Sequence, residues 1–331
     1  MTWERLFGYR HAFDHPVTLW ITLGIGGVLV AALLVIAVLG QSGAVDGALR
    51  TELRKRTLSW LVLAPLILGP VLLGAGWHMA AVLVLSLGCF REYSRATGLF
   101  REKLVTFVVV VGIAAVWFAV VDHWYGFFVA LFPLAVVLIA VAPIARDRPK
   151  GYIQRVALGV FGFMLFGCAL GHFAYLGNDW NYRPIVLMLL LGVQMNDVFA
   201  FVIGKTMGRR KLVPNTSPGK TIAGAVGSLV VTTPLVAVLA HHVFRGTNLD
   251  RPFVLALLGF LTSVSGQLGD LMLSSIKRDL GIKDMGVTIP GHGGLLDRFN
   301  SLLLAAPVVF HFVGYHVGIG LDQPVRIITG P

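Results

Sequence analysis

SVSGQLGDLMLSSIKRDLGIKDMGVTIPGHGGLLDRFNS, residues 263–301, joins two apolar runs and concentrates polar residues more densely than the rest of the chain. It contains four acids, four bases, one histidine and a glycine-rich segment. In its first half, polar residues recur at spacings of three and four: Ser263, Gln267, Asp270, Ser274 and Lys277. Residues at these spacings share one face of a helix. We therefore predict an apolar helix with a polar stripe that ends in two adjacent bases, at positions 277 and 278.

The second half of this segment cannot continue the helix, because five glycines and Pro290 fall between positions 281 and 294. Glycine-rich loops flanked by bases suit phosphate, since their bare backbone N–H groups can approach an anion closely. Asp297 follows near the first turn of the next apolar run, where the helix dipole favours an ionised carboxylate. The pattern is typical of a site for a phosphorylated ligand.

The composition indicates a polytopic membrane protein. Of 331 residues, 56% are hydrophobic and 13% are charged, whereas soluble domains have roughly 25% charged residues. The net charge of +11 suggests nucleic acid, but no basic face with interleaved aromatic residues supports that class. Cys89 and Cys168 both lie in apolar runs, so we expect neither a disulfide framework nor a cysteine metal site.

Ten apolar runs are candidates for crossing a bilayer, which takes about 20 residues. They are 17–39, 57–74, 77–90, 104–121, 125–145, 156–176, 184–204, 221–240, 253–273 and 294–317. We predict an all-α fold of about ten transmembrane helices in one continuous membrane domain. Residues 1–150 would form the N-terminal helices, and 151–331 the catalytic region.

Basic residues alternate between the connections of these runs. Five connections hold 21 of the 27 lysines and arginines, and the other six lie on the opposite side. These five basic connections are 40–56, 91–103, 146–155, 205–220 and 274–298. Because positive loops stay cytoplasmic, we predict that both termini face outward and that the polar segment faces the cytoplasm. The connection 91–103 has two interpretations, a short amphipathic helix at the interface or a solvated connector.

The polar segment closely resembles the signature of phosphatidate cytidylyltransferases, the CDP-diacylglycerol synthases. The resemblance spans positions 274–298 with fixed spacing, which makes it far more specific than a short motif. It rests on Ser274-x-Ile276-Lys277-Arg278, then Lys283-Asp284, then Pro290-Gly291-His292-Gly293-Gly294-Leu295-x-Asp297-Arg298. Two further elements resemble the family: Ser217-Pro218-Gly219-Lys220-Thr221, and an intramembrane Asp197 that precedes Gly204-Lys205-x-x-Gly208.

Three positions depart from the family pattern. Ala223, Leu273 and Asn300 stand where the family usually has carboxylates. The pair Asp270 and Asp297 is intact. The departures put the level of activity, the number of metal ions and the choice of substrate in doubt.

The resemblance implies the reaction of CTP with phosphatidate to CDP-diacylglycerol and pyrophosphate, with one or two Mg²⁺ ions. We expect Asp270, Asp297, Lys277 and Arg278 to be catalytic, and Asp270, Asp297 and Asp197 to bind metal. The expected substrate-binding residues are Ser217, Lys220, Thr221, Ser274, Lys283, Asp284, His292, Gly293, Gly294 and Arg298. The other expected partner is the lipid bilayer, in a bacterial inner membrane with the site facing the cytoplasm. Nucleic acid is not expected, and a homodimer is left open.

Alternatives remain at each of these positions. If their roles were structural, Asp270 would pair with Arg278, Asp297 with the neighbourhood of Arg298, and Asp197 with an arginine within the helix bundle. Ser217 and Thr221 would only cap a turn, and His292 would only shape one. For the whole protein, the alternatives are a transferase for another lipid phosphate or lipid alcohol, a weakly active homologue with a scaffold role, and a secondary transporter.

Overall fold

The computed structural model describes residues 2–41, 47–289, 293–320 and 326–330. All ten predicted runs are helical in it, and a short helix α1 (Thr2–Phe7) precedes them. The first five are α2 (Pro16–Gln41), α3 (Gly47–Leu73), α4 (Ala75–Thr97), α5 (Lys103–Val121) and α6 (Tyr125–Val141). The sixth is composite, with α7 (Tyr152–Gly162), the π-helix η3 (Phe163–Ala169) and α8 (Leu170–Tyr175). The last four are α9 (Tyr182–Met207), α10 (Ile222–Val243), α11 (Pro252–Asp279) and α12 (Leu295–Val317).

Within the described residues, eight helical segments are long and apolar enough to cross a bilayer. The remaining two predicted runs are Thr57–Leu73, a shorter apolar part of α3, and α4. The last two turns of α4 carry charged residues, which lowers its hydropathy. The prediction of an all-α polytopic membrane protein is confirmed.

Neither interpretation of the segment 91–103 is correct for its first half, which is not a separate amphipathic helix and not a solvated connector. Residues 91–97 are the last two turns of α4, and the 3₁₀ turn η1 (Leu99–Arg101) leads to α5. Glu92, Tyr93 and Ser94 are buried. Short 3₁₀ turns also follow α6, as η2 (Ala142–Arg146), and α8, as η4 (Leu176–Asn178).

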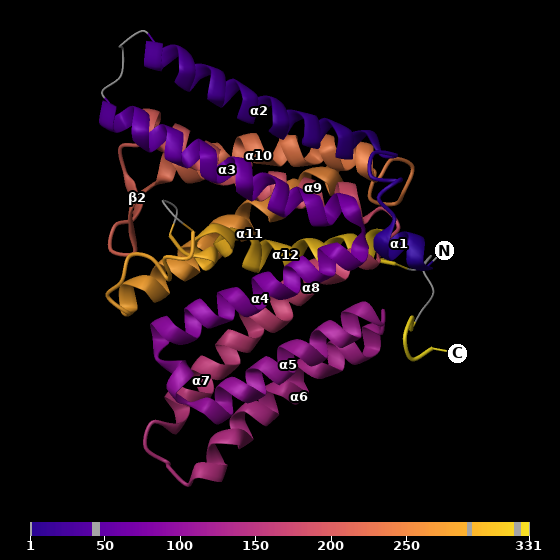
Figure 1. Cartoon of the computed structure of the whole chain (residues 1–331), viewed down its shortest axis with the longest axis vertical. Helices are drawn as coiled ribbons and strands as arrows, with labels where there is room; N and C mark the ends of the chain where they lie inside the picture. Colours follow the sequence, from indigo (N-terminus) through magenta and orange to yellow (C-terminus); the bar gives the residue numbers. More distant parts are fainter. Residues whose placement is uncertain (1, 42–46, 290–292, 321–325, 331) are drawn as a thin grey trace.

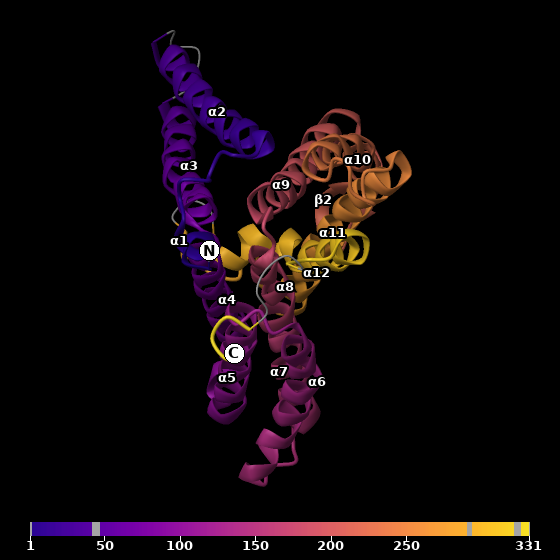
Figure 2. The ribbon, with the colours of Figure 1, turned by 90° about the vertical axis from the view of Figure 1, so that its right-hand side faces the viewer.

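Figure 1 shows the connections α4–α5, α6–α7, α9–α10 and α11–α12 at the end of the molecule opposite both termini. This arrangement agrees with the prediction that the basic connections share one side. We call the end of the molecule that holds these four connections the basic end. Figure 2 shows α9, α10 and α11 grouped on one side of α12, and α3, α4 and α5 on the other. The central helix α12 contacts α4, α8, α9 and α11. Which end faces the cytoplasm stays a prediction.

A small antiparallel hairpin interrupts the helices between α9 and α10. Its strands are β1 (Lys211–Val213) and β2 (Ser217–Thr221), with Lys211 opposite Thr221. Strand β2 runs directly into α10, and the Thr221 hydroxyl accepts a hydrogen bond from the Gly224 N–H at 3.1 Å. Thr221 is therefore the N-cap of α10, and the hairpin places Lys220 over the basic end of α11.

Candidate active site

The predicted polar stripe lies along α11 and faces its neighbours. The Ser263 hydroxyl donates to Asn196 Oδ1 of α9 at 2.6 Å, and Gln267 Nε2 donates to the Ser228 hydroxyl of α10 at 3.1 Å. Ser263, Asn196 and Ser228 are fully buried. Buried polar groups need such partners, since each one left unpaired would cost free energy. The stripe thus joins α9, α10 and α11 through side chains.

Asp270 lies nearer the basic end of the same helix and has partners from two other elements. Lys220 of β2 forms an ion pair with Asp270 Oδ2, and Asn300 Nδ2 of α12 donates to Asp270 Oδ1. The side chains of Lys220 and Asp270 are 23% and 21% exposed, so the pair is shielded yet reachable from the surface. The alternative of an Asp270–Arg278 pair is not what the structure shows.

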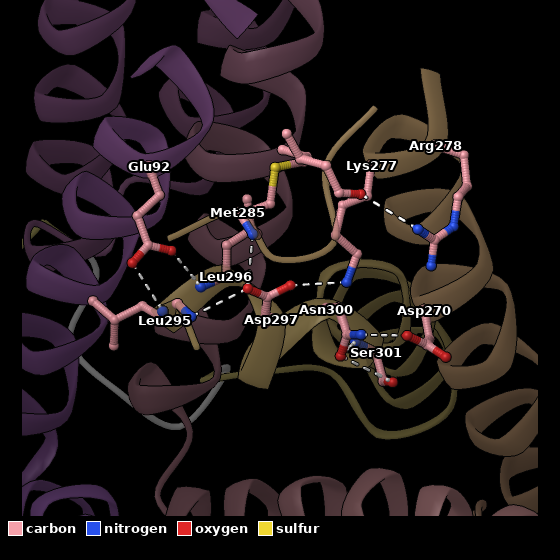
Figure 3. A network of polar contacts seen from close by, with 12 residues as sticks. Glu92, Asp270, Lys277, Arg278, Met285, Leu295, Leu296, Asp297, Asn300 and Ser301 are labelled. Atoms are coloured by element: carbon pink, nitrogen blue, oxygen red, sulfur yellow. Dashed lines mark hydrogen bonds and ion pairs between the residues drawn. The ribbon is translucent and has the colours of Figure 1, made fainter. Parts of the chain in front are cut away.

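Asp297 lies in the first turn of α12, as the sequence predicts. Its Oδ1 accepts a hydrogen bond from Lys277 Nζ at 2.8 Å, and the two side chains are 5% and 13% exposed (Figure 3). Its Oδ2 accepts from the backbone N–H of Met285 at 2.9 Å and of Gly294 at 3.1 Å. The carboxylate therefore binds the loop, the helix terminus and α11 at once.

A chain of hydrogen bonds links two of the three predicted metal carboxylates. Asn300 donates to Asp270, and its own Oδ1 accepts from the Ser301 N–H at 2.8 Å. The Ser301 hydroxyl then donates to Asp197 Oδ2 at 2.9 Å. Figure 3 shows Asp297, Asn300, Ser301 and Asp270 side by side. The carboxylates on α9, α11 and α12 thus belong to one polar region, and Asp197 has a serine partner here where an arginine was the alternative.

The other predicted substrate-binding residues surround this region less tightly. Arg278 Nε donates to the carbonyl of Thr216 at 3.1 Å, which ties the hairpin turn to α11. Ser274 is buried, Ser217 is partly buried, and Lys283, Asp284 and Arg298 are exposed at the basic end. Gly293 has a φ of 82° and Gly294 precedes α12. His292 lies outside the described residues, with Pro290 and Gly291.

The carboxylates of Asp270 and Asp297 suit Mg²⁺, the ion that the resemblance implies. Among the described residues, no three or more His, Cys, Asp or Glu side chains form a ready-made metal cage. Mg²⁺ does not require one, because it is usually held by one or two carboxylates plus substrate phosphates and water. Asp270 and Asp297 supply carboxylate oxygens that now accept from lysines.

Sequence reasoning missed Glu92, which is 5% exposed and lies on α4, far from the signature in the chain. Its carboxylate accepts from the backbone N–H groups of Leu295 and Leu296 (Figure 3). The available signal was the sequence Gly-Gly-Leu-Leu at the start of α12. Asp297 accepts from the Gly294 N–H, but this sequence offers no side-chain acceptor for the N–H groups of Leu295 and Leu296, which another element can therefore bind.

Comparison with known proteins identifies the family. The profile of the cytidylyltransferase family matches residues 54–316. The chain belongs to this family. The matched range includes Glu92 and every described residue of the site, from Asp197 to Ser301.

Three relatives illustrate the similarity. The chain is 38% identical to the uncharacterized protein YnbB of Escherichia coli over 58% of this chain and 65% of the relative. It is 36% identical to the phosphatidate cytidylyltransferase of Staphylococcus saprophyticus over 45% of this chain and 59% of the relative. It is 30% identical to the phosphatidate cytidylyltransferase of Bacillus subtilis over 63% of this chain and 80% of the relative. The match to the first two covers less than two thirds of their length.

Proposed function

We propose that the protein transfers the cytidylyl group of CTP to phosphatidate at the basic end. The observation that carries the proposal is the pair of lysine–carboxylate contacts, Lys220–Asp270 and Lys277–Asp297, where β2, α11 and α12 meet. The ammonium groups of such pairs suit the phosphates of a triphosphate, and the carboxylates suit the divalent cation that accompanies it. Membership of the cytidylyltransferase family and the two relatives named phosphatidate cytidylyltransferase support this choice.

The reaction needs no side-chain nucleophile. A phosphate oxygen of phosphatidate attacks the α-phosphorus of CTP, and a new P–O bond forms. The bond between the α-phosphorus and the bridging oxygen breaks, and pyrophosphate leaves with the electron pair. Catalysis then depends on placing the two anions in line and on neutralising their charge.

The residues of the site divide this work. Lys220 and Lys277 are placed to hold phosphate oxygens, because each ammonium already meets an anionic oxygen. Arg278 keeps the hairpin turn, and with it Lys220, against α11. Asp270 and Asp297 would hold Mg²⁺, with Asp197 nearby, and the ion would supply charge neutralisation at the triphosphate. Exposed Lys283 and Arg298 would attract both anionic substrates to the surface.

The location of the site suits a soluble nucleotide and a lipid headgroup. Asp270 lies seven residues before Lys277 on α11, which is about 10 Å along a helix. The carboxylates are therefore shielded but within reach of the surface at the basic end. We assign this end to the cytoplasm because basic loops are retained there, and the membrane to a bacterial inner membrane because the named relatives are bacterial.

The experiment is an assay of purified protein with CTP, Mg²⁺ and a panel of acceptors. The panel contains phosphatidate, another lipid phosphate, and a lipid alcohol. We expect CDP-diacylglycerol and an equal amount of pyrophosphate with phosphatidate, at the highest kcat/KM of the panel. Product with the lipid alcohol alone would move the protein to a different transferase. Absence of pyrophosphate release with every acceptor would contradict the proposal.

A further inference from the structure

The N-terminus of α12 is held by a carboxylate from a distant helix. Glu92 Oε1 accepts from the Leu295 N–H at 3.0 Å, and Glu92 Oε2 accepts from the Leu296 N–H at 2.9 Å. The Thr288 hydroxyl also donates to Oε1 at 2.5 Å. One side chain therefore binds the first two residues of α12, as Figure 3 shows, and Thr288 of the loop before it.

The backbone is shaped to admit this carboxylate. A Cβ on Gly286 would lie 2.6 Å from Glu92 Oε1, and a Cβ on Gly294 would lie 2.5 Å from Glu92 Oε2. Real Cβ atoms do not approach oxygen so closely, so both positions need glycine as long as Glu92 stays where it is. Glu92 itself is 5% exposed. Two glycines of the signature segment are thus explained by a residue on α4.

The energetics favour this arrangement. A buried carboxylate is costly unless hydrogen bonds compensate it, and here three donors do so. Two of these are the unpaired N–H groups of a helix N-terminus, where the dipole favours an anion by about 0.3–1 kcal/mol. Bonds from N–H to an ionised acceptor are also stronger than neutral ones.

Glu92 and Asp297 divide the same helix terminus between them. Glu92 takes the N–H groups of Leu295 and Leu296, whereas Asp297 takes those of Gly294 and Met285. This division leaves Asp297 Oδ1 to face Lys277. Without Glu92, the free N–H groups would compete for Asp297, the next carboxylate along the helix, and draw it from the lysine.

We propose that Glu92 is a positioning residue for the active site. It fixes the start of α12 and residues 286–288 so that Asp297 keeps its orientation toward Lys277. Glu92 touches neither Lys277 nor Asp270 and acts through the backbone. The kinetic part of this inference rests on the proposed function, whereas the effect on the helix terminus does not.

The test compares Glu92→Gln and Glu92→Ala with the wild-type protein. Glutamine keeps the volume of the side chain but has one acceptor oxygen and adds an N–H₂ that opposes a backbone N–H. The matched control is Glu102→Gln, which removes a carboxylate at the same end whose partner is Arg146 at 3.5 Å in an exposed pair. Two quantities are measured: deuterium uptake by peptides covering residues 293–299, and kcat and KM with CTP and phosphatidate.

We expect protection of the amides of residues 293–299 against deuterium exchange to be highest in the wild-type protein, lower in Glu92→Gln and lowest in Glu92→Ala. The expected kcat of Glu92→Gln falls at least tenfold while KM for phosphatidate stays within twofold, and the control changes neither. Wild-type protection in Glu92→Gln would overturn the proposal. So would lost protection with an unchanged kcat, since Glu92 would then cap the helix without positioning the site. If the wild-type protein makes no nucleotide-lipid, the proposed function fails, and wild-type protection in both Glu92 variants still refutes the positioning role.

Discussion

The α6–α7 and α11–α12 connections lie at the same end of the protein and have similar basic content, but their bases have different partners. In the first, Arg155 donates to the backbone carbonyls of Lys150 and Arg148, and Arg146 pairs with Glu102 with both side chains more than a third exposed. In the second, Lys277 pairs with an Asp297 side chain that is 5% exposed. Exposed pairs contribute about 0–1 kcal/mol, whereas breaking a buried pair costs roughly 3–5 kcal/mol.

The difference separates two meanings of a basic loop. The number of bases in a connection indicates which side of the membrane it occupies, and it does so equally for both connections. A site for a phosphorylated substrate needs more, namely bases and carboxylates held together away from bulk water. Only the second connection meets that condition among the two, because α4, α11 and the hairpin enclose it.

The largest effect should come from the buried carboxylate of the second connection. We expect Asp297→Asn to lower kcat/KM for CTP at least 100-fold, about 2.7 kcal/mol, because Lys277 loses its anion and the site loses a carboxylate proposed to bind Mg²⁺. Asp147→Asn is the matched control, since Asp147 lies in the α6–α7 connection and its φ of 44° is tolerated by asparagine. Equal losses in the two variants, measured in steady-state assays, would abolish the contrast.

Replacing the bases should have the next largest effect. Lys277→Ala and Arg278→Ala should each lower kcat/KM at least tenfold, about 1.4 kcal/mol, through a lost phosphate contact and a loosened hairpin. Lys150→Ala, which removes an exposed base of the α6–α7 connection, should stay within twofold. Unchanged kinetics for Lys277→Ala in well-folded protein would remove this lysine from the site.

Restoring the carboxylate usual in the family at position 300 should have a smaller effect. Asn300 donates to Asp270, so Asn300→Asp exchanges a hydrogen bond for a second negative charge. Two neighbouring carboxylates repel each other, and a divalent cation bound between them would relieve that repulsion. We expect the Mg²⁺ concentration for half-maximal rate to fall about threefold, which is about 0.65 kcal/mol at 1.4 kcal/mol per factor of ten. A higher Mg²⁺ requirement would argue against metal binding at Asp270.

The smallest perturbation tests that the basic connections α6–α7 and α9–α10 lie on one side of the membrane, opposite the α10–α11 connection. Cysteines introduced at the exposed positions Lys150 and Asn215 should react with a membrane-impermeant reagent only in inside-out membrane vesicles. A cysteine at the exposed position Asn248 should react only in right-side-out vesicles. The native Cys89 and Cys168 are buried and should contribute little background. Equal labelling of Asn215 and Asn248 from one side would refute the topology.

The helices and the stripe on α11 were predictable because apolar runs and spacings of three and four are local properties of the sequence. Asp297 in the first turn of α12 was predictable for the same reason. The resemblance supplied Lys220, but neither spacing nor charge indicated that it would meet Asp270. That contact depends on a hairpin, which brings β2 across the end of α11.

Glu92 marks the limit of reading the sequence without the fold. Its partners, Leu295 and Leu296, are backbone donors that have no signature in side-chain chemistry. Two first-turn N–H groups without a local acceptor predict that some other acceptor exists, but the acceptor's identity depends on how α4 packs against α12. The structure resolves it by placing the two helices side by side.

The central claim is that cytidylyl transfer depends on a divalent cation held at Asp270 and Asp297. The most direct measurement is CDP-diacylglycerol formation by Asp270→Asn across a Mg²⁺ titration, beside wild-type protein and with folding checked by thermal unfolding. We predict a rate below one hundredth of wild type at every Mg²⁺ concentration, a loss of about 2.7 kcal/mol or more in transition-state stabilisation. An Asp270→Asn protein that keeps full Mg²⁺-dependent activity would contradict the claim.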